Sequence, residues 1–251
     1  MAQKISTQKS TSSKPTILVA HGWSLNPETR EHWQALISLL EQAGYPVKYL
    51  DMPGFELDLK KAWQLDDYVQ WLLSHVKQAK KCVVLAHSFG GQIACRLAST
   101  QPKNLQALIL IGPAGIIDQA WSKQCKRKVF GVLAKTGKRL PLGKVKKLAQ
   151  RLLYFLARER DYYQASPLLK KTMSQVIQDE ILNDLNKILV PCLIFWGEKD
   201  NFTPVKHAKI FAEQVKNSEL IVMPQAGHSP HYYSPEPIGK KIITFLQKLE
   251  N

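Results

Sequence analysis

Six short apolar runs alternate with helical patterns along most of this chain. The runs are residues 16–20, 47–50, 82–86, 107–111, 192–196 and 220–223. Nearly continuous apolar runs of this length are typical of strands that are buried on both faces of a parallel sheet. Helical patterns accompany them at residues 31–43, 65–76, 203–215 and 237–249. The alternation predicts an α/β fold, in which a mostly parallel six-stranded sheet carries helices on both faces.

The alternation stops between the fourth and fifth runs. Residues 116–189 contain helical patterns but no clear strand, so we expect a helical cap inserted into a core that comprises residues 15–115 and 190–251. Residues 1–14 are polar and rich in Ser, Thr and Lys, which predicts a flexible tail rather than a secretory signal.

Almost all of the excess positive charge lies in the expected cap. The chain has 35 Lys and Arg against 20 Asp and Glu, but residues 123–171 alone hold fifteen basic residues and two acidic ones. Such a basic surface is often only a solvated face, although it can also attract anionic substrates or contact an anionic membrane. Nucleic acid is the weaker alternative, since no recognition motif accompanies the charge.

The cysteines give no sign of a metal site or of disulfides. Cys82, Cys95, Cys125 and Cys192 show neither CxxC spacing nor a cluster with histidines. We therefore expect free thiols, no structural metal and a cytoplasmic location.

Residues 86–91, Ala-His-Ser-Phe-Gly-Gly, join the third apolar run to a helical pattern at 92–98. The small residues Ala86 and Gly90 allow a strand and a helix to approach closely at a sharp turn. A serine at such a turn has an exposed hydroxyl and is typical of a nucleophile elbow. The pattern makes Ser88 a candidate nucleophile, and an ordinary serine in a tight turn is the alternative.

A serine nucleophile needs a base, and the base needs an acid that orients it. The carboxyl ends of parallel strands meet at one edge of the sheet, so residues that follow the strands gather there. Asp200 follows the fifth run and His228 the sixth. His231 competes with His228 for the role of base.

Five motifs in this order resemble the α/β-hydrolase superfamily. They are His-Gly-Trp at 21–23, Asp-Met-Pro-Gly at 51–54, the elbow, Gly-Glu-Lys-Asp at 197–200 and Gly-His at 227–228. The resemblance covers residues 16–249. The chain departs from the family pattern at Ala86, where Gly is more common, and in its short N-terminal tail, where many members have an antiparallel hairpin.

The resemblance implies a role for each matched residue. Ser88 would be the nucleophile, His228 the general base and later acid, and Asp200 the residue that orients His228. Asp118 is the alternative acid, since some members of the superfamily carry the acid after the fourth strand. The backbone N–H groups of Trp23 and Phe89 would form the oxyanion hole.

Other polar and aromatic residues near these motifs fit less specific roles. We expect His21 and His87 to be structural and Asp51 to be a turn residue. We expect the aromatic side chains of the cap either to fill the core between cap and body or to line a substrate pocket. The candidates for the pocket are Trp121, Phe130 and Tyr154.

These observations predict a serine hydrolase that needs no metal or organic cofactor. Its expected substrate is a carboxylic ester with a small or lipid-like acyl group, cleaved through an acyl-enzyme on Ser88. A carbon–carbon bond hydrolase or a thioesterase with an anionic substrate is the first alternative. The second is a non-catalytic module that contacts a membrane or nucleic acid through the basic cap.

Overall fold

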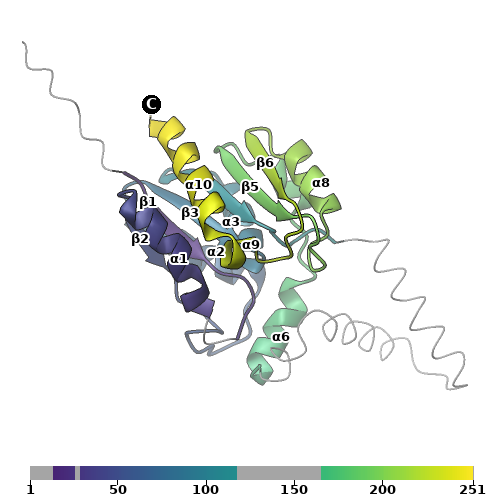
Figure 1. Cartoon of the computed structure of the whole chain (residues 1–251). Helices are drawn as coiled ribbons and strands as arrows, with labels where there is room; N and C mark the ends of the chain where they lie inside the picture. The colour runs from purple at the N-terminus through teal and green to yellow at the C-terminus, as the bar shows by residue number, and fades with distance from the viewer. Residues whose placement is uncertain (1–13, 26–28, 118–164, 251) are drawn as a thin grey trace, which may run out of the picture.

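The computed structural model of the chain describes residues 14–25, 29–117 and 165–250. A six-stranded sheet forms its centre (Figure 1). The strands are β1 Thr16–Ala20, β2 Val47–Tyr49, β3 Cys82–His87, β4 Leu105–Ile111, β5 Cys192–Gly197 and β6 Ser218–Met223. Their order is β2-β1-β3-β4-β5-β6, and neighbouring strands are parallel. The prediction of a parallel six-stranded α/β sheet is confirmed.

Helices cover both faces of the sheet. They are α1 Thr29–Gln42, α2 Leu65–Gln78, α3 Phe89–Ala98, α6 Pro167–Val176, α7 Leu182–Leu185, α8 Lys206–Gln214, α9 Pro230–Tyr233 and α10 Pro235–Glu250. Helices α1 and α10 lie side by side over one face (Figure 1), whereas α2, α3 and α8 cover the other. None of these helices combines the length and the apolar character that a membrane span requires.

Strand β1 shows how the sequence divides its apolar residues between the two faces. Ile17 and Val19 pack in the core with α1 and α10, while Leu18 and Ala20 pack in the core with α2 and α3. All four side chains are buried. Alternate strand residues point to opposite faces, so a strand with a helical layer on each side must be apolar at every position.

The order of the strands reverses direction between β1 and β3. The chain passes from β1 outward to β2 and then returns to place β3 on the other side of β1. In open parallel sheets, ligands bind outside the carboxyl ends of the strands at such a switch point. Because β1 and β3 are neighbouring parallel strands, the loop after β1 and the elbow after β3 lie next to each other at this point.

Several element boundaries differ from those expected. Strand β4 begins two residues early because Leu105 already pairs with Cys82, ahead of a shift in register. Lys14, the last residue of the expected tail, contacts the body of the protein. Its ammonium donates to the Ala43 carbonyl at 2.6 Å and lies 4.4 Å from the Tyr45 ring centroid. Residues 1–13 lie outside the described residues.

Part of the expected cap packs with the body of the protein. Helix α6 buries its apolar face, and the Thr172 hydroxyl within it accepts a hydrogen bond from the Trp63 N–H at 2.8 Å. Ile181, Leu185 and Ile188 belong to the same core as α2 and α3. Residues 181–188, which the sequence analysis assigned to the cap, therefore pack with the body because their apolar side chains complete its core.

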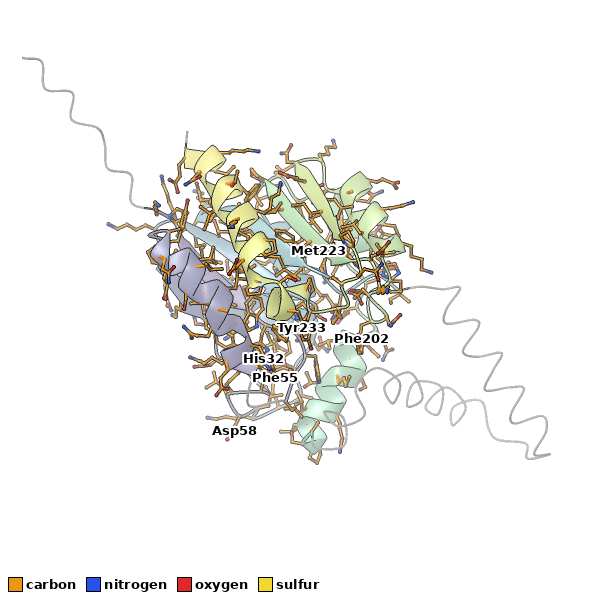
Figure 2. All side chains as sticks on the ribbon, viewed as in Figure 1. His32, Phe55, Asp58, Phe202, Met223 and Tyr233 are labelled. Atoms are coloured by element: carbon orange, nitrogen blue, oxygen red, sulfur yellow. The ribbon has the colours of Figure 1, made fainter. Side chains whose placement is uncertain are left out.

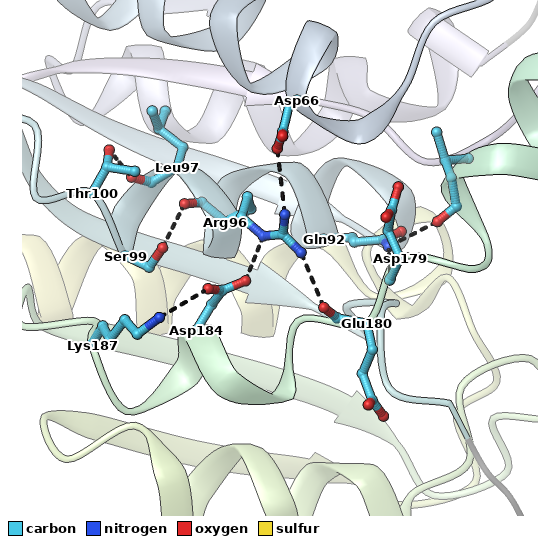
Figure 3. Close-up of polar contacts among 11 residues, drawn as sticks. Asp66, Gln92, Arg96, Leu97, Ser99, Thr100, Asp179, Glu180, Asp184 and Lys187 are labelled. Carbon is cyan, nitrogen blue, oxygen red and sulfur yellow. Dashed lines mark hydrogen bonds and ion pairs between the residues drawn. The ribbon is translucent and has the colours of Figure 1, made fainter.

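Polar contacts fasten this stretch to α2 and α3 (Figure 3). The guanidinium of Arg96, on α3, pairs with Asp184 of α7 and with Asp66 of α2. Gln92, one turn earlier, donates its side-chain amide to the Asp179 carbonyl at 2.7 Å. These contacts attach the returning end of the insertion to the helix that begins at the elbow.

Three of the four cysteines are free and buried, as expected: Cys82, Cys95 and Cys192. Burial raises the pKa of the Cys82 thiol to about 12, so this group is not a reactive thiolate at neutral pH. Cys125 lies outside the described residues.

Candidate active site

Ser88 occupies a strained turn between β3 and α3. Its φ and ψ are 52° and −115°, a backbone conformation that residues other than glycine rarely adopt. The Ser88 N–H donates to the Ile111 carbonyl at 3.0 Å, and the Ser88 carbonyl accepts from the N–H groups of Gln92 and Ala114 at 3.1 and 2.9 Å. These hydrogen bonds hold the strained turn in place and leave the side chain partly exposed.

Two glycines allow the loop after β1 to lie against the elbow. A methyl group on Gly90 would lie 2.3 Å from the Ala20 carbonyl oxygen and 2.5 Å from that of His21. A methyl group on Gly22 would lie 3.0 Å from Cβ of Ser88. Only glycine fits this approach, which places the Gly22 backbone directly beside Ser88.

The structure brings Ser88, His228 and Asp200 together in one hydrogen-bonded chain. Nε2 of His228 lies 2.9 Å from Oγ of Ser88, and Nδ1 of His228 lies 2.8 Å from Oδ2 of Asp200. A carboxylate accepts, so Nδ1 carries the proton and Nε2 is the acceptor for the Ser88 hydroxyl. His228 is 9% exposed and Asp200 5%. Three residues from three distant parts of the sequence thus have the geometry that a nucleophilic serine requires.

The carboxylate of Asp200 is held as an anion. Burial raises its pKa, but hydrogen bonding and charge interaction with His228, together with hydrogen bonds from Thr203, outweigh burial and lower it overall. Oδ1 accepts the N–H groups of Phe202 and Thr203 at 2.8 and 2.9 Å, and Oδ2 accepts the Thr203 hydroxyl at 2.8 Å. The turn around this carboxylate also explains why α8 begins at Lys206 rather than at residue 203.

Thr203 is a residue that the sequence analysis missed. Its hydroxyl lies 2.8 Å from Oδ2 of Asp200, 3.4 Å from Nδ1 of His228 and 3.2 Å from the Gly112 carbonyl oxygen. The Asp-x-x-Thr spacing at 200–203 was a usable signal, since a threonine three residues after an aspartate can hydrogen-bond to it.

Replacing Thr203 by Val is expected to lower kcat for ester hydrolysis about tenfold, with little change in KM. Val has nearly the same shape but removes one of the four hydrogen bonds that fix the Asp200 carboxylate, a loss of about 1.5 kcal/mol. Steady-state kinetics on a chromogenic ester measures the change. Thr244→Val on α10, an exposed site, is the matched control, and equal kcat values for the two variants would contradict this role.

Contacts from two directions position the loop that carries His228. Gly197, at the end of β5, lies so close that a methyl group on it would be 2.0 Å from the Gly227 carbonyl oxygen. From the other side, Nε2 of His87 donates to the His228 carbonyl at 3.0 Å. His87 is thus a structural residue beside the site, as predicted.

His231, the alternative base, lies in a different place. It is fully buried, and its ring packs 4.2 Å from the Trp33 ring and 4.6 Å from the His87 ring, measured between centroids. Burial is the main cause that holds the pKa of His231 well below its usual range. The histidine that reaches Ser88 is therefore His228.

Trp23 and Phe89 lie in the two segments that border Ser88, the loop after β1 and the start of α3. Phe89 is the first residue of α3, and the N–H groups of a first helical turn have no partner within the helix. Trp23 follows Gly22 in the loop beside Ser88, and its ring lies 5.4 Å from the Phe89 ring. Both backbone N–H groups belong to segments that border Ser88, and their role as oxyanion donors stays a prediction.

The remaining candidates lie elsewhere. Asp51 pairs with Arg30 at an exposed position, which fits a turn residue. The other candidate acid and the three pocket aromatics, Asp118, Trp121, Phe130 and Tyr154, lie outside the described residues. Most of the basic segment does too, so its contact with anionic substrates or membranes stays a prediction. Within the described ranges, no group of three or more His, Cys, Asp or Glu is placed to hold a metal ion.

Comparison with known proteins identifies the family. Residues 15–235 match the family model described as the alpha/beta hydrolase fold. The chain belongs to the alpha/beta hydrolase fold family. The expected resemblance to this family is thereby confirmed.

Relatives of this hydrolase include a lipase and an esterase. It is 26% identical over 270 residues to monoacylglycerol lipase abhd6-B of Xenopus laevis, covering 95% of this chain and 77% of that protein. It is 26% identical over 248 residues to the pimeloyl-[acyl-carrier protein] methyl ester esterase of Pectobacterium carotovorum, covering 92% and 94%. Among solved structures, MenH from S. aureus superposes with a TM-score of 0.70 at 20% identity, covering 96% and 97%, which supports the fold.

Proposed function

We propose that this hydrolase cleaves carboxylic esters through an acyl-enzyme on Ser88. The proposal rests on the hydrogen bonds between Ser88, His228 and Asp200. Nε2 of His228 lies 2.9 Å from Oγ of Ser88, and Nδ1 of His228 lies 2.8 Å from Oδ2 of Asp200. The names of its relatives, a monoacylglycerol lipase and a methyl ester esterase, support an ester with a small or lipid-like acyl group.

In the first half of the reaction, Oγ of Ser88 attacks the ester carbonyl carbon as its proton moves to Nε2 of His228. The carbonyl oxygen becomes an oxyanion, which accepts hydrogen bonds from the N–H groups of Trp23 and Phe89. One such donor typically stabilises the transition state by about 2.7–4 kcal/mol. The C–O bond to the alcohol then breaks, and the leaving oxygen takes the proton from Nε2. The products are a free alcohol and an acyl ester on Ser88.

In the second half, water attacks the acyl carbon while Nε2 of His228 takes its proton. The same two N–H groups stabilise the second oxyanion. The bond to Oγ breaks, and Ser88 regains its proton from His228 while the carboxylic acid leaves. Throughout, Asp200 keeps the proton of His228 on Nδ1 and stabilises the imidazolium that forms in each half.

A fluorophosphonate probe tests the nucleophile. We expect the probe to label the folded wild-type protein covalently, with the modified residue mapped to Ser88 by mass spectrometry, and to spare a Ser88→Ala variant. Folded wild-type protein that takes up no label would overturn the proposal.

A panel of chromogenic esters with acyl chains of increasing length then tests the reaction class. We expect measurable kcat/KM on at least one ester. Labelled protein without turnover on any ester would contradict ester hydrolysis and direct attention to thioesters and to carbon–carbon bonds, the first alternative from the sequence.

A further inference from the structure

His21 is a fully buried histidine next to the candidate oxyanion loop, and the steps above do not use its side chain. It directly precedes Gly22 and Trp23. Its ring lies parallel to the Tyr49 ring at 5.6 Å and edge-on to the Phe55 ring at 5.5 Å, between centroids. Phe55 also packs edge-on against Trp23 at 4.9 Å. The aromatic contacts therefore fix the plane of the His21 ring.

Both ring nitrogens of His21 face hydrogen-bond acceptors. Nδ1 lies 2.6 Å from the Gly22 carbonyl oxygen, and Nε2 lies 3.0 Å from Oε2 of Glu56. A carbonyl oxygen can only accept, so Nδ1 carries a proton. A carboxylate also accepts only, so Nε2 carries one too when Glu56 is ionised. A ring that donates at both nitrogens is an imidazolium and bears a positive charge.

Further contacts indicate that Glu56 is ionised. Its Oε2 also accepts the Met52 N–H at 2.8 Å, and its side chain is 27% exposed. Partial burial raises the pKa of Glu56, but the hydrogen bond and charge interaction with His21, together with backbone hydrogen bonds, lower it overall. A buried cation is tolerated where it is both paired and hydrogen-bonded, as His21 is here.

The Gly22 carbonyl and the Trp23 N–H belong to the same peptide group. We propose that His21, held as an imidazolium by Glu56, positions and polarises the Gly22–Trp23 peptide so that its N–H is a stronger donor to the oxyanion. This inference rests on the proposed ester hydrolysis. It makes His21 and Glu56 positioning residues for the reaction, which extends the purely structural role that the sequence suggested for His21.

A charge-assisted hydrogen bond at a peptide carbonyl acts in two ways. It draws electron density toward the oxygen, which strengthens the N–H of the same peptide as a donor. It also fixes the peptide plane, so the N–H needs no reorientation when negative charge develops. The other charged groups nearby balance each other, because Arg30, which lies 4.6 Å from the Tyr49 ring centroid, pairs with Asp51.

Nitrogen NMR of the histidine rings tests the protonation state without any substrate. Long-range ¹H–¹⁵N correlation at pH 7 distinguishes an imidazolium from either neutral tautomer. We expect both nitrogens of His21 to carry protons, with the resonances assigned through contacts to the Phe55 ring. A neutral His21 ring in the wild-type protein would overturn the inference, whatever the outcome of probe labelling.

Kinetics of Glu56→Gln tests the effect on the reaction. The amide oxygen can still accept from Nε2, but the negative charge that stabilises the imidazolium is gone. We expect kcat to fall about tenfold with KM unchanged. This loss is smaller than the roughly 10²–10³-fold loss in kcat on removing an oxyanion donor, because the Trp23 N–H is weakened but still present. Glu213→Gln makes the same chemical change at an exposed carboxylate on α8 and should leave kcat unaltered.

Two results would contradict the polarising role: a Glu56→Gln variant with wild-type kcat, or one in which only KM changes. Failure of this inference and failure of the proposed function are distinguishable. Absence of probe labelling would remove the reaction itself, whereas labelled protein with a neutral His21 would remove only the positioning role.

Discussion

Replacing His228 by Ala is expected to lower kcat for ester hydrolysis about 10⁶-fold, close to the loss from removing a complete triad. Without the imidazole, nothing accepts the Ser88 proton over the 2.9 Å hydrogen bond, and nothing donates one to the leaving alcohol. Residual activity should come from substrate binding and the oxyanion hole alone. The measurement is kcat on the best chromogenic ester, with folding checked by circular dichroism.

His75→Ala is the control for this variant. His75 lies in the last turn of α2, and the chain then enters β3 at its amino end, so this histidine is at the edge of the sheet opposite the site. We expect its kcat to match that of the wild type. A folded His228→Ala variant that keeps more than about a hundredth of wild-type kcat would show that another group is the base.

Asp200→Asn is expected to lower kcat about 10⁴-fold with little effect on KM. The amide fills the same space, but it removes the charge that stabilises the imidazolium, and its NH₂ group can donate to Nδ1. His228 then carries its proton on Nε2, where it can no longer accept one from Ser88. The loss should appear in kcat because the charge matters most as the imidazolium forms.

Asp58→Asn is the matched control for Asp200→Asn. Asp58 is exposed in the loop between β2 and α2 and lies at the lower edge of the molecule in Figure 2. Equal kcat values for the two variants would rule out Asp200 as the orienting acid. A fall in the Asp200 variant that is confined to KM would contradict its role in the chemical steps.

An aromatic side chain beside the base was not identified from the sequence. Phe202, which is labelled in Figure 2, is 49% exposed. The centroid of its ring lies 5.1 Å from that of the His228 ring. Its sequence context, just after Asp200, suggests only a turn. The neighbouring His228 ring comes from 26 residues further along the chain, so no local pattern could reveal the contact.

The sequence by itself determined the parts of this protein that depend on local patterns. Apolar runs located all six strands, because a strand buried on both faces must be apolar at every position. Ser88 was identifiable because small residues must surround a sharp strand-to-helix turn. Strand order then placed Asp200 and His228 at the same edge of the sheet as Ser88.

The tertiary structure alone decided what depends on contacts between distant segments. It decided that His228 rather than His231 is the partner of Ser88. Contacts with Gly197 and His87 position the His228 loop so that its imidazole hydrogen-bonds to the Ser88 hydroxyl. It also joined Glu56 to His21 across 35 residues of sequence. These pairings join polar groups from distant segments, and the packing of whole helices and strands decides which groups meet. The physical reason is that a buried polar atom must form a hydrogen bond, and only the fold determines which partner lies within reach.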